Sequence, residues 1–265
     1  MLRRRISKAG VVLALALACG TSAHAESSLD AVRARGRIRV GVKTDAAPFG
    51  FIDARGHPVG FEVDLARFFA RVLFDDEGRA RLVPVTTSTR FAELQAGRVD
   101  LLLATVTATE QRRTVAELSD PYFTSGSLIL VARDSRLGTL GEAAGRKVAV
   151  VKGSVQEADV AELQPRAILI TVGSLAAGAH AVRSGQADAF LYDDVAVLAL
   201  ARRDPALRVT GAPIRPRAYV AAARKEDTGL IRWVNGWLAK MRRDGTYRGL
   251  WRRYFTPFES HLVGA

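Results

Sequence analysis

Apolar and polar positions alternate along most of the chain with two different periods. Three short runs, Ile38–Val42, Arg81–Val85 and Val99–Ala104, have the composition of strands. Between the first two runs, apolar residues recur at the spacing of one helical face: Phe61, Leu65, Phe68, Phe69 and Val72. A shorter helix is predicted from Thr89 to Ala96, and Gly97 ends it.

The same alternation returns in the middle of the chain. Strands are predicted over Lys147–Val151, Ile168–Val172 and Ala187–Tyr192. Helices are predicted after each of them, over Val155–Leu163, Ser174–Ser184 and Asp194–Arg202. Because strands that alternate with helices favour an open α/β architecture, the pattern predicts two α/β lobes with largely parallel sheets.

The last part of the chain is predicted to be helical. One apolar stripe consists of Leu230, Val234, Trp237, Leu238 and Met241. Gly245 ends that helix, and a further helix is predicted over Thr246–Phe255. We interpret the three tryptophans of this part as packing residues and not as a cage for a ligand: Trp233, Trp237 and Trp251.

The first 25 residues have the parts of a secretory signal peptide. A basic start is followed by the apolar run Val11–Ala18, too short to span a bilayer, and by the small-residue site Ala23-His24-Ala25. Cleavage there gives a periplasmic chain that begins near Glu26 and lacks the only cysteine, Cys19. Two alternatives stay open, namely acylation of Cys19 as a lipoprotein and export by the twin-arginine route.

Charge and histidine content argue against several function classes. The formal charge of +12 falls to +8 when the four basic residues of the signal peptide are removed. A basic surface can bind nucleic acid or anionic membranes, but these residues are scattered, so we expect no nucleic-acid partner. His57, His180 and His261 lack the spacing of metal ligands, and no nucleophile elbow or phosphate-binding loop is present. We expect no metal, no cofactor and no catalytic residue.

Polar residues follow the predicted strand Val99–Ala104. In open α/β sheets, ligands bind beyond the carboxyl ends of strands and near helix N-termini. Thr107 and Glu110 have the spacing of a capping box, and Arg112 lies in the first turn of the next helix. Amide N–H groups, hydroxyls and a guanidinium at one point suit a carboxylate. The alternative is a capped helix with a surface arginine.

Two later strand ends carry further candidates. Ser154 and Glu157 again have the spacing of a capping box, which is compatible with an anion site or with a simple helix cap. Asp193 follows an apolar strand, where its carboxylate can receive an ammonium group or cap the next helix. Because Asp194 can provide the cap equally well, Asp193 is free to face a cleft.

Several segments together resemble the polar amino-acid-binding proteins of ABC transporters, the bacterial extracellular solute-binding protein family 3. The resemblance covers about 38–255 and rests on six short motifs in order: Gly60-Phe61-Glu62-Val63-Asp64-Leu65-Ala66, Leu94-Gln95-Ala96-Gly97-Arg98-Val99-Asp100, Thr109-Glu110-Gln111-Arg112, Ser119-Asp120-Pro121-Tyr122, Gly185-Gln186-Ala187-Asp188-Ala189 and Asp244-Gly245-Thr246-Tyr247.

The resemblance implies roles for single residues. Arg112 is similar to the arginine that binds the ligand's α-carboxylate, and Thr105 and Thr107 are similar to its hydroxyl and backbone partners. Asp193 lies where the family holds the α-ammonium, and Ser154 where the second lobe contacts the carboxylate. Val155 departs from the threonine often found there, which puts a side-chain hydrogen bond in doubt but not the backbone N–H.

The segments around Lys43 and Arg90 are similar to the aspartate/glutamate-binding branch, where these positions hold the side-chain carboxylate. Three cations, Lys43, Arg90 and Arg112, against Asp193 leave a surplus of two positive charges, which an acidic amino acid would largely compensate. Burying uncompensated charge is costly, so a cationic ligand is excluded. The alternatives are that Lys43 and Arg90 point to solvent, or that another polar amino acid binds.

The fold implied by the resemblance is the two-lobed type II periplasmic-binding-protein fold, α/β, with two crossover strands and a ligand cleft between the lobes. We expect one lobe over 29–123 plus 218–258 and the other over 124–217. The expected function is capture of glutamate or aspartate by a monomer that delivers it to the membrane permease of an ABC transporter. The alternatives are a small-carboxylate dehydratase on the same fold and a sensory ligand-binding module.

Overall fold

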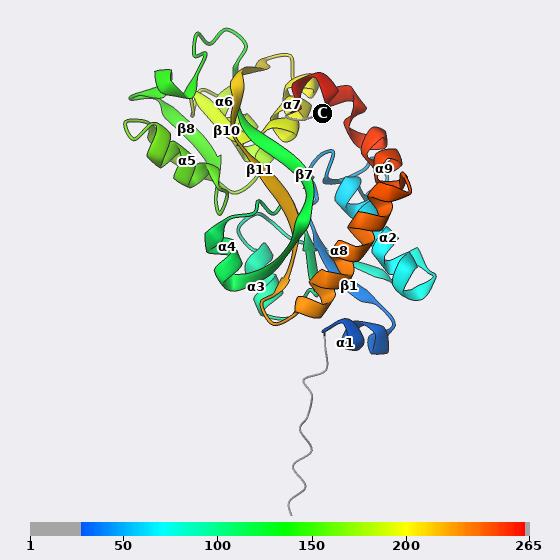
Figure 1. Cartoon of the computed structure of the whole chain (residues 1–265). Helices are drawn as coiled ribbons and strands as arrows, with labels where there is room; N and C mark the ends of the chain where they lie inside the picture. The colour runs from blue at the N-terminus through cyan, green and yellow to red at the C-terminus, as the bar shows by residue number, and fades with distance from the viewer. Residues whose placement is uncertain (1–27, 263–265) are drawn as a thin grey trace, which may run out of the picture.

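The computed structural model describes residues 28–262, so the expected signal peptide and Cys19 lie outside the described residues. An eight-stranded sheet runs through the described chain in the order β5-β1-β6-β11-β7-β10-β8-β9 (Figure 1). Its strands in chain order are β1 (Ile38–Val42), β5 (Ala80–Pro84), β6 (Leu101–Leu103), β7 (Ala116–Ala132), β8 (Lys147–Val151), β9 (Ile168–Val172), β10 (Ala189–Asp193) and β11 (Leu207–Arg224). A small second sheet, absent from the sequence predictions, contains β2 (Asp45–Ala46), β3 (Gly50–Ile52) and β4 (Pro58–Val59).

Helices cover both faces of the long sheet. The α-helices are α1 (Ser28–Arg35), α2 (Phe61–Phe74), α3 (Arg90–Gln95), α4 (Glu110–Val115), α5 (Gln156–Leu163), α6 (Leu175–Arg183), α7 (Asp194–Arg203), α8 (Thr228–Arg243) and α9 (Thr246–Phe255). Short 3₁₀ turns are η1 (Glu77–Arg79), η2 (Leu140–Ala143) and η3 (Thr256–His261). No helix among the described residues is both long and apolar enough to cross a bilayer.

Parallel strands occupy the two ends of the long sheet and form the two lobes. At one end β1 lies between β5 and β6 and is parallel to both of them. At the other end β8 lies between β9 and β10, again parallel to both. The strands β1, β8 and β9 have the bounds that the sequence predicts, although β9 lies at the edge of the sheet and is largely exposed.

The centre of the sheet is antiparallel, so the prediction of largely parallel sheets was wrong there. The strands β7 and β11 pair from Ala116 with Arg224 to Ala132 with Leu207, and thus run through both lobes (Figure 1). Register shifts interrupt the ladder around Pro213, where a missing N–H is tolerated at a bulge. The expected lobe boundaries fall at Thr124 and Ala218, which are direct cross-strand partners.

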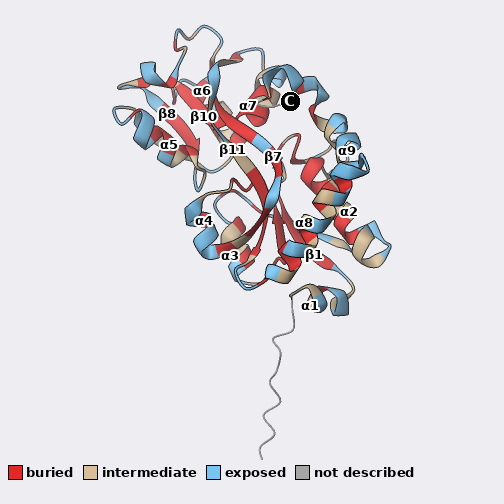
Figure 2. Ribbon diagram, in the orientation of Figure 1, coloured by how far each residue is buried: buried red, intermediate tan, exposed pale blue. Residues whose placement is uncertain are grey.

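The helix α2 begins where only glycine fits. Gly60 has a φ of 132°, and a Cβ there would lie 2.3 Å from the carbonyl oxygen of Phe49. The helix then buries the apolar face that its sequence predicts, with Phe61 and Leu65 fully inaccessible to solvent (Figure 2). Phe68 and Phe69 contact two of the three tryptophans, so Trp233 and Trp237 pack as expected.

Aromatic rings attach the C-terminal helices to the first lobe. Phe255 of α9 lies 4.6 Å from Phe123 of β7 and 5.1 Å from Phe49, measured between ring centroids. Phe49 and Phe123 are themselves 5.0 Å apart in an edge-to-face arrangement. Trp251 adds a fourth ring, 5.7 Å from Phe255. Such pairs add about 0.5–1.5 kcal/mol each beyond their buried area, so the chain returns to the first lobe through this cluster.

Asp194 fixes the start of α7 to the point where β7 enters the second lobe. Its Oδ1 accepts hydrogen bonds from the Val195 N–H and the Ser125 hydroxyl, both at 2.7 Å. Its Oδ2 accepts the Gly126 N–H at 2.9 Å. Asp194 is fully buried, so these three donors would lack a partner without it.

We predict that Asp194→Asn destabilises the fold by about 1–3 kcal/mol, because the new amide faces a buried donor and leaves it unsatisfied. Urea unfolding followed by circular dichroism measures the change. The control is Asp134→Asn on the exposed surface, which should stay within about 0.5 kcal/mol of the wild type. Equal stabilities of the two variants would contradict the role of Asp194.

Candidate ligand-binding site

The seven site residues predicted from the sequence lie at strand ends of both lobes, around one region. Six are buried, with exposed fractions from 1 to 9%: Lys43, Arg90, Thr105, Thr107, Arg112 and Asp193. Ser154 is half-buried, but its hydroxyl oxygen is inaccessible and has no partner among the described residues. The structure therefore brings the seven together; their contact with a ligand stays a prediction.

Arg112 spans the two lobes. Its Nη1 donates to the carbonyl oxygen of Thr107 at 2.8 Å, and its Nη2 donates to that of Gly153 in the second lobe at 3.2 Å. Burial and the neighbouring charge of Arg90 lower the pKa of Arg112 to about 9, while Asp193 opposes that shift. Within residues 28–262 the guanidinium makes no ion pair with a carboxylate. A buried guanidinium of this kind is suited to an anion.

The first predicted capping box was wrong. Thr109, not Thr107, is the N-cap of α4, and its hydroxyl accepts the Arg112 N–H at 3.1 Å. Thr107 instead forms a β-bridge with Tyr219 of β11, which keeps the backbone extended for two more residues. Because α4 starts two residues later than predicted, the carbonyl of Thr107 is free to orient Arg112.

The second capping box was also wrong. The helix α5 begins at Gln156 after Val155, and no side chain caps it. The carboxylate of Glu157 accepts the N–H of Gly153 at 2.8 Å and makes no bond to Ser154. It therefore stabilises the loop before the helix. The hydroxyl of Ser154 is therefore left without a partner among the described residues. The hydroxyl of Thr105 is likewise buried and unpartnered within the described chain.

Asp193 and Asp194 have different hydrogen-bond partners, as the sequence allowed. Asp194 takes the structural bonds described above, and Asp193 makes no cap bond at the start of α7. Its Oδ1 accepts a hydrogen bond from Nε2 of Gln156 at 2.9 Å. Burial raises the pKa of Asp193, whereas Tyr219, Gln156 and the charge of Arg90 act against the rise. Gln156 and Tyr219 were missed, since nothing in their local sequence marks them.

Lys43 and Arg90 are buried, so the alternative that they point to solvent is excluded. Nζ of Lys43 lies 2.8 Å from the hydroxyl oxygen of Thr87 and 3.0 Å from Oδ1 of Asp45. Nη1 of Arg90 donates to the carbonyl oxygens of Ala104 and Thr105, at 2.5 and 2.9 Å. Lys43 thus already has a carboxylate partner, which the sequence-based charge count omitted. The signal was present, because residues two apart in an extended segment share a face.

Glu62 is a further buried residue of the site that the sequence reasoning missed. Its Oε1 accepts the N–H of Thr105 at 2.7 Å and the hydroxyl of Tyr122, and the side chain is fully buried. Burial raises the pKa of Glu62 to about 7. Thr105 has a φ of 49°, a strained conformation for a β-branched residue, and the bond from Glu62 holds it there. Glu62 lies within the Gly60-Phe61-Glu62 motif, so the motif marked it without revealing its task.

Direct contacts close the two lobes on each other. The hydroxyls of Thr87 and Tyr192 are 3.2 Å apart across the cleft. Gly153, with a φ of 79°, packs so tightly that an added Cβ would lie 3.1 Å from Cα of Ser88. A groove of about 640 Å³ opens at this junction, and both Arg112 and Ser154 line it. Among the described residues no cluster of three or more metal-ligating side chains occurs.

The family model for bacterial extracellular solute-binding proteins, family 3, matches residues 38–257. The chain belongs to this family. Its two-lobed type II periplasmic-binding-protein fold agrees with that membership.

Three similar proteins place the chain within the family. The ABC transporter glutamine-binding protein GlnH of Bacillus subtilis is 33% identical over 252 residues, covering 91% of this chain and 92% of the relative. The P235GK mutant of ArgBP from T. maritima has a TM-score of 0.81 and 30% identity, covering 86% and 99% of the two chains. The ancestral amino acid-binding protein AncCDT-1, a precursor of cyclohexadienyl dehydratase, has a TM-score of 0.80 and 34% identity, covering 87% and 100%.

We predict that Gly153→Ala weakens the contact between the lobes. The added Cβ would press on the backbone of Ser88, and the positive φ costs about 1–3 kcal/mol for a residue other than glycine. Small-angle X-ray scattering should therefore give a larger radius of gyration than for the wild type. The matched control is Gly173→Ala, where no atom lies within 4 Å of the added Cβ. Identical radii for the two variants would count against the contact.

Proposed function

We propose that the protein is the periplasmic binding component of an amino-acid ABC transporter and captures its ligand between the two lobes. The observation that carries the proposal is the buried pair of opposite charges at the cleft. Arg112 has no carboxylate partner within 28–262, and Asp193 lies near enough to affect its pKa. A zwitterionic α-amino acid supplies the missing carboxylate to Arg112 and an ammonium to Asp193.

The family supports the transport role. Solute-binding proteins of this family include the glutamine-binding relative of an ABC transporter, which spans nearly the whole chain. The partner is then a membrane permease, and the expected signal peptide agrees with a periplasmic location. Capture works by closure, because a ligand between the lobes contacts Arg112 of one and Ser154 of the other only in the closed state.

The ligand's side chain meets a cleft whose charges are nearly balanced. Lys43 is paired with Asp45 at 3.0 Å, and Arg90 is saturated at Nη1 by two backbone carbonyls. Glu62 lies close enough that the charges of both cations lower its pKa. With Asp45 and Glu62 counted, and because the pKa of Glu62 is raised to about 7, the surplus that favoured glutamate or aspartate falls from two positive charges to one or less. We propose a polar, uncharged amino acid such as glutamine, the ligand named for the Bacillus relative.

The dehydratase and sensory alternatives lead to different observations. AncCDT-1 is described as a precursor of a dehydratase, yet it is itself an amino acid-binding protein. A carrier returns its ligand unchanged in a one-to-one amount after prolonged incubation, whereas a dehydratase does not. Mass spectrometry of the recovered ligand separates the two.

We predict that Arg112→Ala lowers affinity for every α-amino acid that binds by about 30-fold or more. Truncating one member of a buried, hydrogen-bonded charge pair costs at least about 2 kcal/mol. Calorimetric titration measures the loss. Arg113→Ala, in the neighbouring and exposed position, is the matched control and should change affinity less than about twofold. A loss below tenfold in Arg112→Ala would reject the assigned role.

We predict that glutamine binds more tightly than glutamate, and that Asp45→Asn shifts this preference toward glutamate by about tenfold or more. The substitution removes the carboxylate beside Lys43, and a ligand carboxylate can then take its place. Competition titrations of glutamine, asparagine, glutamate and aspartate on both proteins measure the ratios, with Asp134→Asn as the control. A wild type that prefers the acids would restore the acidic ligand and leave the transport role intact.

A further inference from the structure

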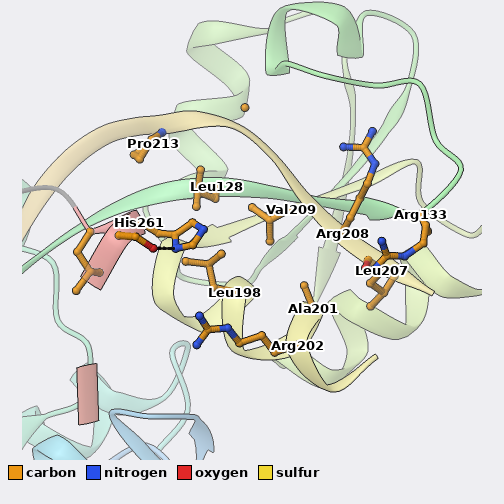
Figure 3. Close-up of a pocket in the computed structure, with 13 residues that line it drawn as sticks. Leu128, Arg133, Leu198, Ala201, Arg202, Leu207, Arg208, Val209, Pro213 and His261 are labelled. Carbon is orange, nitrogen blue, oxygen red and sulfur yellow. Dashed lines mark hydrogen bonds between the residues drawn. The ribbon is translucent and has the colours of Figure 1, made fainter. Parts of the chain in front are cut away.

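A second groove lies away from the cleft. It is formed by the first residues of β11, the helix α7 and the C-terminal turn η3 (Figure 3). Its volume is about 660 Å³, within the range of small-molecule sites. It shares no lining residue with the groove at Arg112. A ligand here would therefore occupy a separate site, whatever binds between the lobes.

The floor of this groove is apolar. Leu128 of β7, Leu198 of α7 and Val209 of β11 converge there from three elements (Figure 3). Leu128 and Leu198 are almost fully buried, so they form a fixed surface and not mobile side chains. A hydrocarbon group on this floor would lose contact with water at little conformational cost.

Two guanidinium groups border the floor, from Arg133 and Arg202, whereas Arg208 points to the opposite face of the sheet and contacts the loop at Ser135 (Figure 3). No aspartate or glutamate of residues 28–262 lines the groove, and none forms an ion pair with Arg133 or Arg202. Two cations without a carboxylate among the lining residues make a basic border that an anion can neutralise.

Backbone carbonyls hold these arginines in place. Nε of Arg133 donates to the carbonyl oxygen of Pro205 at 2.5 Å, and its Nη2 donates to that of Leu207 at 3.3 Å. Arg202 donates to the carbonyl of Pro257, and its guanidinium lies 4.4 Å from the ring centroid of Phe258. Each guanidinium carries five N–H donors, so most of them stay available. The cations are oriented in advance, which lowers the entropic cost of binding.

We propose that this groove is a second ligand site and takes an organic anion with an apolar body, such as a carboxylate on a hydrocarbon chain. The hydrocarbon lies on the floor of Leu128, Leu198 and Val209, and the carboxylate pairs with the arginines at the border. A free amino acid is unsuited to the site, because its ammonium would meet two cations and no acidic partner. The proposal does not depend on the amino-acid ligand of the cleft.

Octanoate, below its micelle concentration, is the probe. Calorimetric titration should give saturable one-to-one binding, at least tenfold tighter than for octanol, octylamine or acetate. Octanol lacks the charge, octylamine reverses it, and acetate lacks the apolar body. Octanoate as weak as octanol, or acetate as tight as octanoate, would overturn the proposal.

The double variant Arg133→Gln/Arg202→Gln locates the site. It should weaken octanoate at least tenfold, whereas the control Arg203→Gln, exposed and outside the groove, should change it less than twofold. Thermal unfolding monitored by circular dichroism checks that both variants are folded. Equal octanoate binding in the two variants contradicts the proposal, and so does one-for-one displacement of octanoate by an amino acid bound in the cleft.

Discussion

The antiparallel pairing of β7 with β11 is the constraint on which the rest of the structure depends. These two strands are the only elements of the described chain that run through both lobes, and each parallel group of strands is attached to one side of the pair. Because the ladder fixes where the strands of each lobe end, it also fixes where the strand-end loops meet. Its register shifts lie between Thr210 and Ala222, so the pair is regular near its ends and irregular where the lobes join.

Charge balance in the cleft follows from that geometry. The end of β10 and the segments that follow β1, β5 and β6 bring together three cations and three carboxylates, of which all but Asp45 are buried: Lys43, Arg90, Arg112, Asp45, Glu62 and Asp193. Buried charges are tolerated when each has a partner. Lys43 has Asp45, whereas Arg90 and Arg112 both have backbone carbonyls as their hydrogen-bond acceptors. One carbonyl partner of Arg112, that of Gly153, lies in the second lobe, and at this guanidinium we propose that the α-carboxylate is bound.

Sequence reasoning recovered what depends on local pattern and missed what depends on tertiary contact. The strands β1, β8 and β9 and the helix α9 were predicted to the residue, since apolar period and glycine stops are local signals. The long strands β7 and β11 were not, because Pro121, Pro213 and the bulges interrupt their pattern. The prediction of the first capping box failed for a similar reason, because the β-bridge from Thr107 to Tyr219 delays the start of α4. Gln156 and Glu62 became visible only when distant segments were brought together.

The two grooves use arginine in the same way and differ in what surrounds it. In both, backbone carbonyls orient the guanidinium: those of Thr107 and Gly153 for Arg112, and that of Pro257 for Arg202. In the cleft, Asp193 lies close by, which is why we propose a ligand that carries both charges there. In the groove beside α7 no carboxylate of the described chain takes that place, and apolar side chains form the floor. The acidic neighbour, and not the arginine, therefore decides whether such a site selects an amino acid or a simple organic anion.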